Sequence, residues 1–314
     1  MKLIYSLAFI LMVPYSMTQD IEYLFAHGHA AGKKQFKYYK ELIPLADKGL
    51  AFDCVDANNK PLYPSIIKIR PTAFGQELDI QVLTNAIQDI NVPIVGIGVS
   101  KGAACWINTA AKKENINSLA ALVLESPFAN VNEIIHKFKF IDYLNYIPCG
   151  QFIAKKGAQK ILCHYDPYGI QPIYSISKIT NKNLPIFLIH SKQDKLIPIN
   201  HSRRLYNKFL KNGFTNVYLI ETDIGHHAGI IHTDQSKIFP KALNSFYHQF
   251  NLPYNKDIPL IDISKYQPDI AEVDKRIKQD TETFKEYIPV IIQIIIILLL
   301  AYFIGRNYLN LPKK

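Results

Sequence analysis

The pentapeptide Gly98-Val99-Ser100-Lys101-Gly102 decides the fold of this 314-residue chain. It follows the apolar run 93–96 and precedes the small-residue, helix-like run Ala103-Ala104-Cys105-Trp106. The sequence therefore predicts a serine at a sharp turn from a buried strand into a helix. Such a turn strains the serine backbone and leaves no room for side chains two positions to either side, so both flanking positions favour glycine. Because a serine at a helix start is commonly just an N-cap, the rest of the chain must support a catalytic interpretation.

Six short β-rich runs alternate with helical patterns along the chain. The runs lie at 21–26, 50–54, 93–97, 120–125, 185–190 and 216–221. Near-continuous apolar strands joined by helices predict an α/β fold with a mostly parallel central sheet and helices on both faces. The helix after Gly75 carries one apolar stripe, and a second helix over about 201–211 is expected to end before Gly213.

Two later loops carry the residues that would activate the serine. Asp194 lies just beyond the run 185–190, and Gly225-His226-His227 follows the run 216–221. Parallel strands present their carboxyl ends at one edge of a sheet, so these loops can converge on Ser100. We expect His226 to accept the serine proton because it directly follows a glycine, with His227 as the alternative base. Asp194 would fix the imidazole tautomer and stabilise the imidazolium.

The first predicted strand ends in His27-Gly28-His29. A His-Gly turn at this place lets a backbone amide point at the reacting carbonyl oxygen. We therefore expect the backbone N–H groups of His29 and Lys101 to form an oxyanion hole, in which fixed donors stabilise the developing negative charge. The alternative is an ordinary loop glycine beside packed histidines.

In this order, the motifs of residues 21–250 resemble the α/β-hydrolase superfamily, in particular its serine aminopeptidase, monoacylglycerol-lipase and prolyl-oligopeptidase-like branches. The motifs are His27-Gly28, Gly98-Val99-Ser100-Lys101-Gly102, Asp194 within 190–198, Gly225-His226, and the strand-exit phrase Leu122-Val123-Leu124-Glu125-Ser126-Pro127-Phe128. The resemblance departs from the family pattern at the start, because the usual leading strands are missing or replaced. It implies an α/β-hydrolase fold and a cofactor-free serine hydrolase that forms an acyl-enzyme on Ser100.

The substrate expected from this resemblance is an acyl ester or thioester, on a small molecule or an acylated protein. A serine peptidase of the aminopeptidase or prolyl-oligopeptidase type is the alternative, and a non-catalytic binding protein with a hydrolase fold is a third possibility. Glu125, at the end of its strand, is an alternative acid to Asp194.

The domain boundaries follow from composition. We expect the hydrolase domain over 20–252, with an aromatic-rich helical lid inserted at about 128–182. The polar and charged stretch 253–286 is expected to form a stalk.

Both ends of the chain are apolar. Residues 288–304 are almost continuously apolar, which predicts a transmembrane helix over 287–305 followed by a basic cytoplasmic tail over 306–314. Residues 1–18 resemble a signal peptide or an uncleaved anchor, although an amino-terminal core strand is an alternative. Together these segments predict a catalytic domain tethered to a membrane on its extracytoplasmic side.

Charge and cysteine content argue against a nucleic-acid-binding protein and against a protein with a C-x-x-C metal or redox motif. The formal net charge is +10, but the lysines are dispersed, so no nucleic-acid-binding stripe is expected. The four cysteines show no C-x-x-C spacing. Cys105 is expected in the core, and Cys149 and Cys163 are candidates for a disulfide in an oxidising compartment. The set His226, His227, His232 and Asp234 matches no usual ligand spacing, so no metal is expected.

Overall fold

The computed structural model describes residues 20–29, 31–44, 49–52, 73–112, 118–136 and 165–279. In this part of the chain, six parallel strands form one sheet in the order β2-β1-β3-β4-β5-β6. The strands are β1 (Glu22–Ala26), β2 (Gly49–Phe52), β3 (Ile94–Val99), β4 (Leu119–Glu125), β5 (Ile186–Ser191) and β6 (Val217–Thr222). Each predicted β-rich run is therefore a strand, and the predicted α/β class with a parallel sheet is confirmed.

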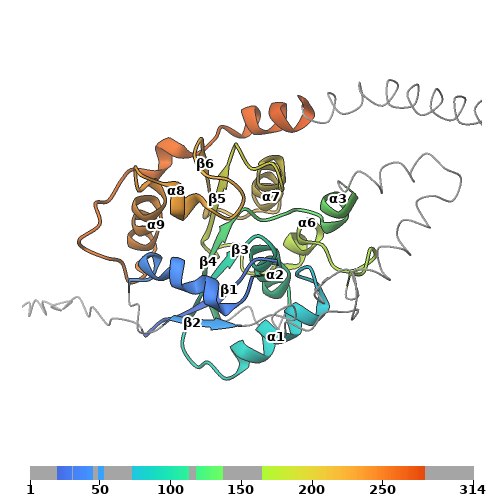
Figure 1. Ribbon diagram of the computed structural model, residues 1–314, viewed down its shortest axis with the longest axis horizontal. Helices are drawn as coiled ribbons and strands as arrows, with labels where there is room; N and C mark the ends of the chain where they lie inside the picture. Colours follow the sequence, from blue (N-terminus) through green and yellow to red (C-terminus); the bar gives the residue numbers. More distant parts are fainter. Residues whose placement is uncertain are drawn as a thin grey trace, which may run out of the picture.

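Helices cover both faces of this sheet (Figure 1). The labelled α-helices of the described residues are α1 (Glu77–Gln88), α2 (Lys101–Ala110), α3 (Val131–His136), α6 (Pro172–Ser175), α7 (Asn200–Lys211), α8 (Ile230–Thr233) and α9 (Ile238–Gln249). Residues 270–279 are also helical. Short 3-10 helices are η1 (Lys33–Tyr38), η2 (Lys40–Leu42), η5 (Ile176–Lys178) and η6 (Ile263–Tyr266). The two helices predicted after Gly75 and over 201–211 are α1 and α7, and Gly213 follows α7 with a left-handed φ of +84°.

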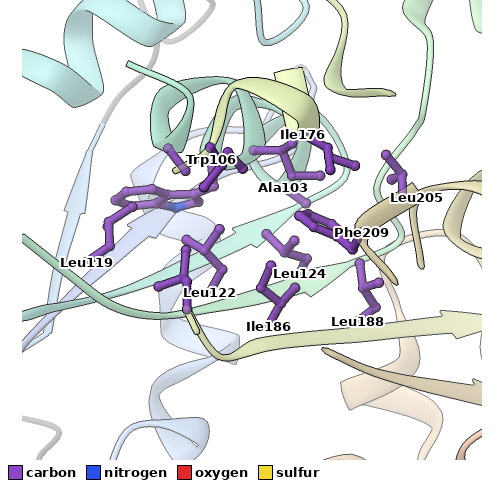
Figure 2. Packing of buried hydrophobic residues seen from close by; sticks show 14 of the residues in the cluster. Ala103, Trp106, Leu119, Leu122, Leu124, Ile176, Ile186, Leu188, Leu205 and Phe209 are labelled. Carbon is purple, nitrogen blue, oxygen red and sulfur yellow. The ribbon is translucent and has the colours of Figure 1, made fainter. Parts of the chain in front are cut away.

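The face covered by α1, α2, α6 and α7 carries one apolar core. Side chains that alternate along β4 and β5, such as Leu122, Leu124 and Ile186, pack there against Trp106 of α2 and Phe209 of α7 (Figure 2). Figure 2 shows the indole lying along the strands, where its Nε1 donates to the Ile97 carbonyl at 2.9 Å. The alternation is the two-residue period of a strand buried on both faces.

The opposite face carries a second core beneath α9, η1 and η2. The other set of strand side chains, including Phe25, Val123 and Phe187, packs there against Tyr39 and Phe246. Two apolar layers therefore hold the sheet rigidly, and its carboxyl edge is a fixed platform for loops.

The polar segment after α9 differs from the expected stalk. Residues 253–279, which we call the C-terminal strap, pack along edge strand β6 and helix α7. Val273 is fully buried in the first core, and Gln267 accepts the Leu219 amide at 3.1 Å. Arg276 joins Arg203 on the nearly buried Glu221 carboxylate. The prediction of a free stalk is wrong for these residues, because their charges pair with the domain and their few apolar residues reach its core.

Several predictions lie outside the described residues. These are the segments 1–18, 287–305 and 306–314, the stalk residues 280–286, most of the lid at 137–164, and Cys54, Cys149 and Cys163. Cys105 is described, and it is buried in the first core, as expected. Of the helices that the structure describes, none combines the length and apolar character needed to cross a bilayer.

Candidate active site

Ser100 lies in the predicted turn between β3 and α2. Its φ of +53° and ψ of −113° are unusual for a residue with a side chain. Its amide donates to the Glu125 carbonyl at 2.8 Å, and its own carbonyl accepts the Ala104 amide in the first turn of α2. The backbone of Ser100 is thus strained but held from both sides, the arrangement expected of a turn that presents a nucleophile.

The flanking glycines are required by close backbone contacts. A Cβ on Gly98 would lie 2.6 Å from the backbone of Ala103, and one on Gly102 would lie 2.0 Å from the carbonyl oxygen of Ala26. Helix α2 therefore begins directly against the end of β1. The steric argument made from the sequence holds at both positions.

His227 is the histidine that contacts the serine. Its Nε2 lies 2.8 Å from Ser100 Oγ, and its Nδ1 lies 2.8 Å from Asp194 Oδ2. Because the carboxylate accepts at Nδ1, the proton of a neutral ring belongs on Nδ1, and Nε2 is left to accept the serine proton. Three loops that follow β3, β5 and β6 thus supply one continuous chain of hydrogen bonds.

The preferred base of the sequence analysis, His226, does not enter this arrangement. His226 is exposed and begins a turn in which its carbonyl accepts the Gly229 amide at 3.3 Å. Ala228, the third residue of the turn, has a left-handed φ of +54°. This turn directs the second histidine inward, so the preference for His226 is corrected to His227. Proximity to Gly225 was a poor guide, because the turn geometry and not the glycine selects the inward residue.

Asp194 is held by four hydrogen bonds. Oδ1 accepts the amides of Leu196 and Ile197 at 2.9 Å each, and Oδ2 accepts from His227 at 2.8 Å and from His190 at 3.1 Å. Burial alone raises the pKa of this carboxyl, but the hydrogen bonds from His190 and His227 outweigh burial and hold the pKa well below its ordinary value. Asp194 is therefore an acceptor that stays ionised beside the imidazole.

His190, a buried residue that contacts Asp194, is not among the residues predicted from the sequence. Its Nε2 lies 3.1 Å from Asp194 Oδ2 and 2.8 Å from the Ile197 carbonyl oxygen. Its Nδ1 lies 2.7 Å from Ser202 Oγ. Two acceptors at Nε2 require a proton there, so His190 donates to Asp194 Oδ2, the oxygen that also accepts from His227. The available signal was a histidine inside an otherwise apolar strand, since such a residue needs buried polar partners.

The expected oxyanion-hole residues lie at the same edge of the sheet. β1 pairs with β3 so that Ala26 is opposite Gly98, which places the His27-Gly28-His29 segment beside the nucleophile turn. The exposed His29 ring stacks on Phe74 at 4.8 Å. Lys101 is the first residue of α2, where backbone amides point out of the helix end. The contribution of these two amides to an oxyanion hole stays a prediction.

A small apolar cluster lies beside Ser100. It contains Ala104, one turn after Ser100, and Ile197, three residues after Asp194. The remaining buried members are Phe128, Val131, Ile135 and Tyr165, with Phe74 packed against them. The Lys101 ammonium is buried beneath this region and paired with Asp79 at 3.4 Å. The carboxyl edge of the sheet thus places the hydrogen-bonded side chains of Ser100, His227 and Asp194 beside this apolar cluster.

The parallel sheet, the nucleophile turn and the loop order Ser100, Asp194, His227 define an α/β-hydrolase fold. Solved structures agree. The structure is similar to the Pyrococcus furiosus esterase, with a TM-score of 0.51 and 18% identity over 74% of this chain and 83% of the esterase. It is also similar to the Pyrococcus horikoshii acylaminoacyl peptidase, with a TM-score of 0.52 and 16% identity over 80% of this chain and 40% of the peptidase.

These likenesses confirm the resemblance to the α/β-hydrolase superfamily at the level of fold. No protein-family model matches the sequence, and a comparison with curated proteins finds no match. At such low identity the shared architecture does not carry an activity from one protein to another. The chemistry must therefore be argued from the site itself.

Proposed function

We propose that this protein is a serine hydrolase that cleaves an acyl ester or thioester through an acyl-enzyme on Ser100. The observation that carries the proposal is the chain from Ser100 Oγ through His227 to Asp194, with both links at 2.8 Å. The fold does not require a strained, positive-φ serine to contact a histidine that a buried carboxylate orients. Their contact therefore favours a catalytic role.

The geometry supports a two-step reaction. Ser100 Oγ attacks the acyl carbon while His227 Nε2 takes the hydroxyl proton, and the same nitrogen then gives that proton to the departing alcohol or thiol. Water activated by His227 attacks the acyl-enzyme in the second step and regenerates the Ser100 hydroxyl. Asp194 stabilises the imidazolium in both steps, and the amides of His29 and Lys101 would stabilise the oxyanion.

The substrate class is proposed from the surroundings of Ser100. The apolar cluster around Ala104, Phe128 and Ile197 favours an apolar acyl group over a charged one. Since one structural neighbour is named an esterase and another a peptidase, hydrolysis of a peptide bond is the competing outcome. Hydrolysis rates on a panel of short and long acyl esters, thioesters and aminoacyl amides distinguish an esterase or thioesterase from a peptidase.

A fluorophosphonate probe tests the nucleophile. We expect covalent labelling of the wild type and a loss of labelling of at least about a hundredfold in Ser100→Ala, because phosphonylation needs an activated serine. Ser126→Ala is the matched control. Ser126 is also fully buried with a positive φ, but it follows β4 and has no part in the proposed chain. Labelling that persists in Ser100→Ala would remove Ser100 from the reaction.

Membrane tethering is proposed from the sequence segment 288–304, with the catalytic domain on the extracytoplasmic side. We expect the full chain to sediment with membranes through a high-salt or alkaline wash. A variant that ends at residue 286 is expected to be recovered in the soluble fraction with unchanged fluorophosphonate labelling. Recovery of the full chain in the soluble fraction would contradict the anchor without affecting the proposed chemistry.

A further inference from the structure

Glu125 is a buried carboxyl that the proposed reaction does not use directly. It is the last residue of β4 and only 1% exposed. Its backbone carbonyl accepts the Ser100 amide at 2.8 Å, while its side-chain Oε1 accepts the Ile230 amide at 3.2 Å. Ile230 begins α8, three residues after His227. One residue therefore connects the nucleophile turn with the loop that carries the base.

Tyr39 supplies a second connection to the same loop. Its hydroxyl donates to the Ala228 carbonyl at 3.4 Å. The ring is fixed by packing on Phe25, with 5.1 Å between the ring centroids. Ala228 is the residue whose positive φ forms the turn that directs His227 inward. Tyr39 and Glu125 therefore both hold this turn, Tyr39 through the Ala228 carbonyl and Glu125 through the Ile230 amide.

The charge of Glu125 is sensitive to pH near neutrality. Burial raises the pKa of this carboxyl to about 7, although Tyr39, the Ile230 amide and the charge of His227 each act to lower it. Asp194 acts in the raising direction. The titratable groups that influence Glu125 are therefore Tyr39, His227 and Asp194, all on elements packed around it.

The protonation state of Glu125 sets the charge of a buried carboxyl beside the turn. Its Oε1 accepts the Ile230 amide, whereas its buried Oε2 has no hydrogen-bond partner among the described residues. Because a negative charge near His227 also favours an imidazolium, ionised Glu125 assists the step in which the base becomes charged.

We propose that Glu125 is a positioning residue for the base, which holds the turn 226–229 through the Ile230 amide and, when ionised, supports the imidazolium formed on His227. The inference rests on the proposed function, since it assigns Glu125 a part in the same site. Glu125 acts through the loop and through its charge. It does not touch the substrate.

The pH profile of fluorophosphonate labelling tests this inference with matched variants. Glu125→Gln keeps an acceptor for the Ile230 amide but cannot ionise. We expect its labelling rate to equal that of the wild type near pH 6 and to fall behind by about threefold to tenfold at pH 8. Glu125→Ala removes the acceptor as well, so it is expected to be slower at every pH. Glu77→Gln changes an exposed carboxylate that pairs with Lys112, far in sequence from the turn 226–229, and is expected to match the wild type.

Hydrogen exchange of the segment 224–233 provides a readout that does not depend on activity. We expect faster exchange in Glu125→Ala than in the wild type, with Glu125→Gln close to the wild type, because only the alanine variant leaves the Ile230 amide without its acceptor. Wild-type pH profiles and wild-type exchange in both variants would overturn the positioning role while leaving the hydrolase proposal intact. Absence of labelling in the wild type itself would instead reject the proposed function, and the exchange data would then decide whether Glu125 holds the loop.

Discussion

His227→Ala is expected to lower kcat/KM by about 10⁴-fold or more, whereas His226→Ala is expected to change it by less than about threefold. The two histidines are neighbours in sequence, but only His227 contacts Ser100 and Asp194. In the proposed reaction, loss of its imidazole removes both the acceptor of the serine proton and the donor to the leaving group. The exposed His226 imidazole has no such contact among those that the structure shows.

Steady-state kinetics on a chromogenic acyl ester measure this difference, with circular dichroism to show that both variants are folded. His226→Ala is the matched control because it changes the same residue type in the same turn. An equal loss in both variants would mean that the turn, and not one imidazole, is required. A large loss in His226→Ala only would reject the assignment of the base to His227.

Gly102→Ala is expected to destabilise the fold by about 3 kcal/mol or more. Alanine is the better helix former, so helix propensity alone would stabilise α2 by about 0.5–1 kcal/mol. The added Cβ would instead lie 2.0 Å from the Ala26 carbonyl oxygen, where only a shift of α2 or β1 can relieve the overlap. Strand β1 and helix α2 are both buried, and α2 begins directly after Ser100. A shift of either element therefore also disturbs the Ser100 turn.

Gly213→Ala is the control for this prediction. Nothing lies within 4 Å of a Cβ at Gly213, so the only cost is the left-handed φ of +84°, about 1–2 kcal/mol. Urea denaturation measures the free energy of unfolding of both variants, and fluorophosphonate labelling reports on the site. A Gly102→Ala protein as stable as the wild type would mean that α2 can move away from β1 without cost.

The residues around Ser100 were predictable because their constraints are local. The two glycines, the preceding apolar strand and the following small residues specify a strand, a turn and a helix within a few residues. Asp194 was predictable for a related reason. It follows a buried parallel strand, and the carboxyl ends of such strands share one edge of the sheet.

The choice between His226 and His227 could not be made in this way. It depends on the positive φ of Ala228, on the hydrogen bond from Tyr39 to the Ala228 carbonyl and on the hydrogen bond from the Ile230 amide to Glu125. The partners of this turn are distant in sequence, since 189 residues separate Tyr39 from Ala228. Composition was also misleading for the C-terminal strap, where Asp274 and Arg276 pair with charges on α7 and β6.

By itself, the sequence determined the parallel α/β sheet, the strained serine turn and the acid that follows the fifth strand, because backbone sterics and apolar periodicity act over short distances. Only the tertiary structure decided which histidine reaches Ser100, that His190 and Glu125 surround the acid and the base, and that residues 253–279 belong to the domain. Those features depend on how distant segments pack, and the free energy of that packing is not encoded in any single stretch of the chain.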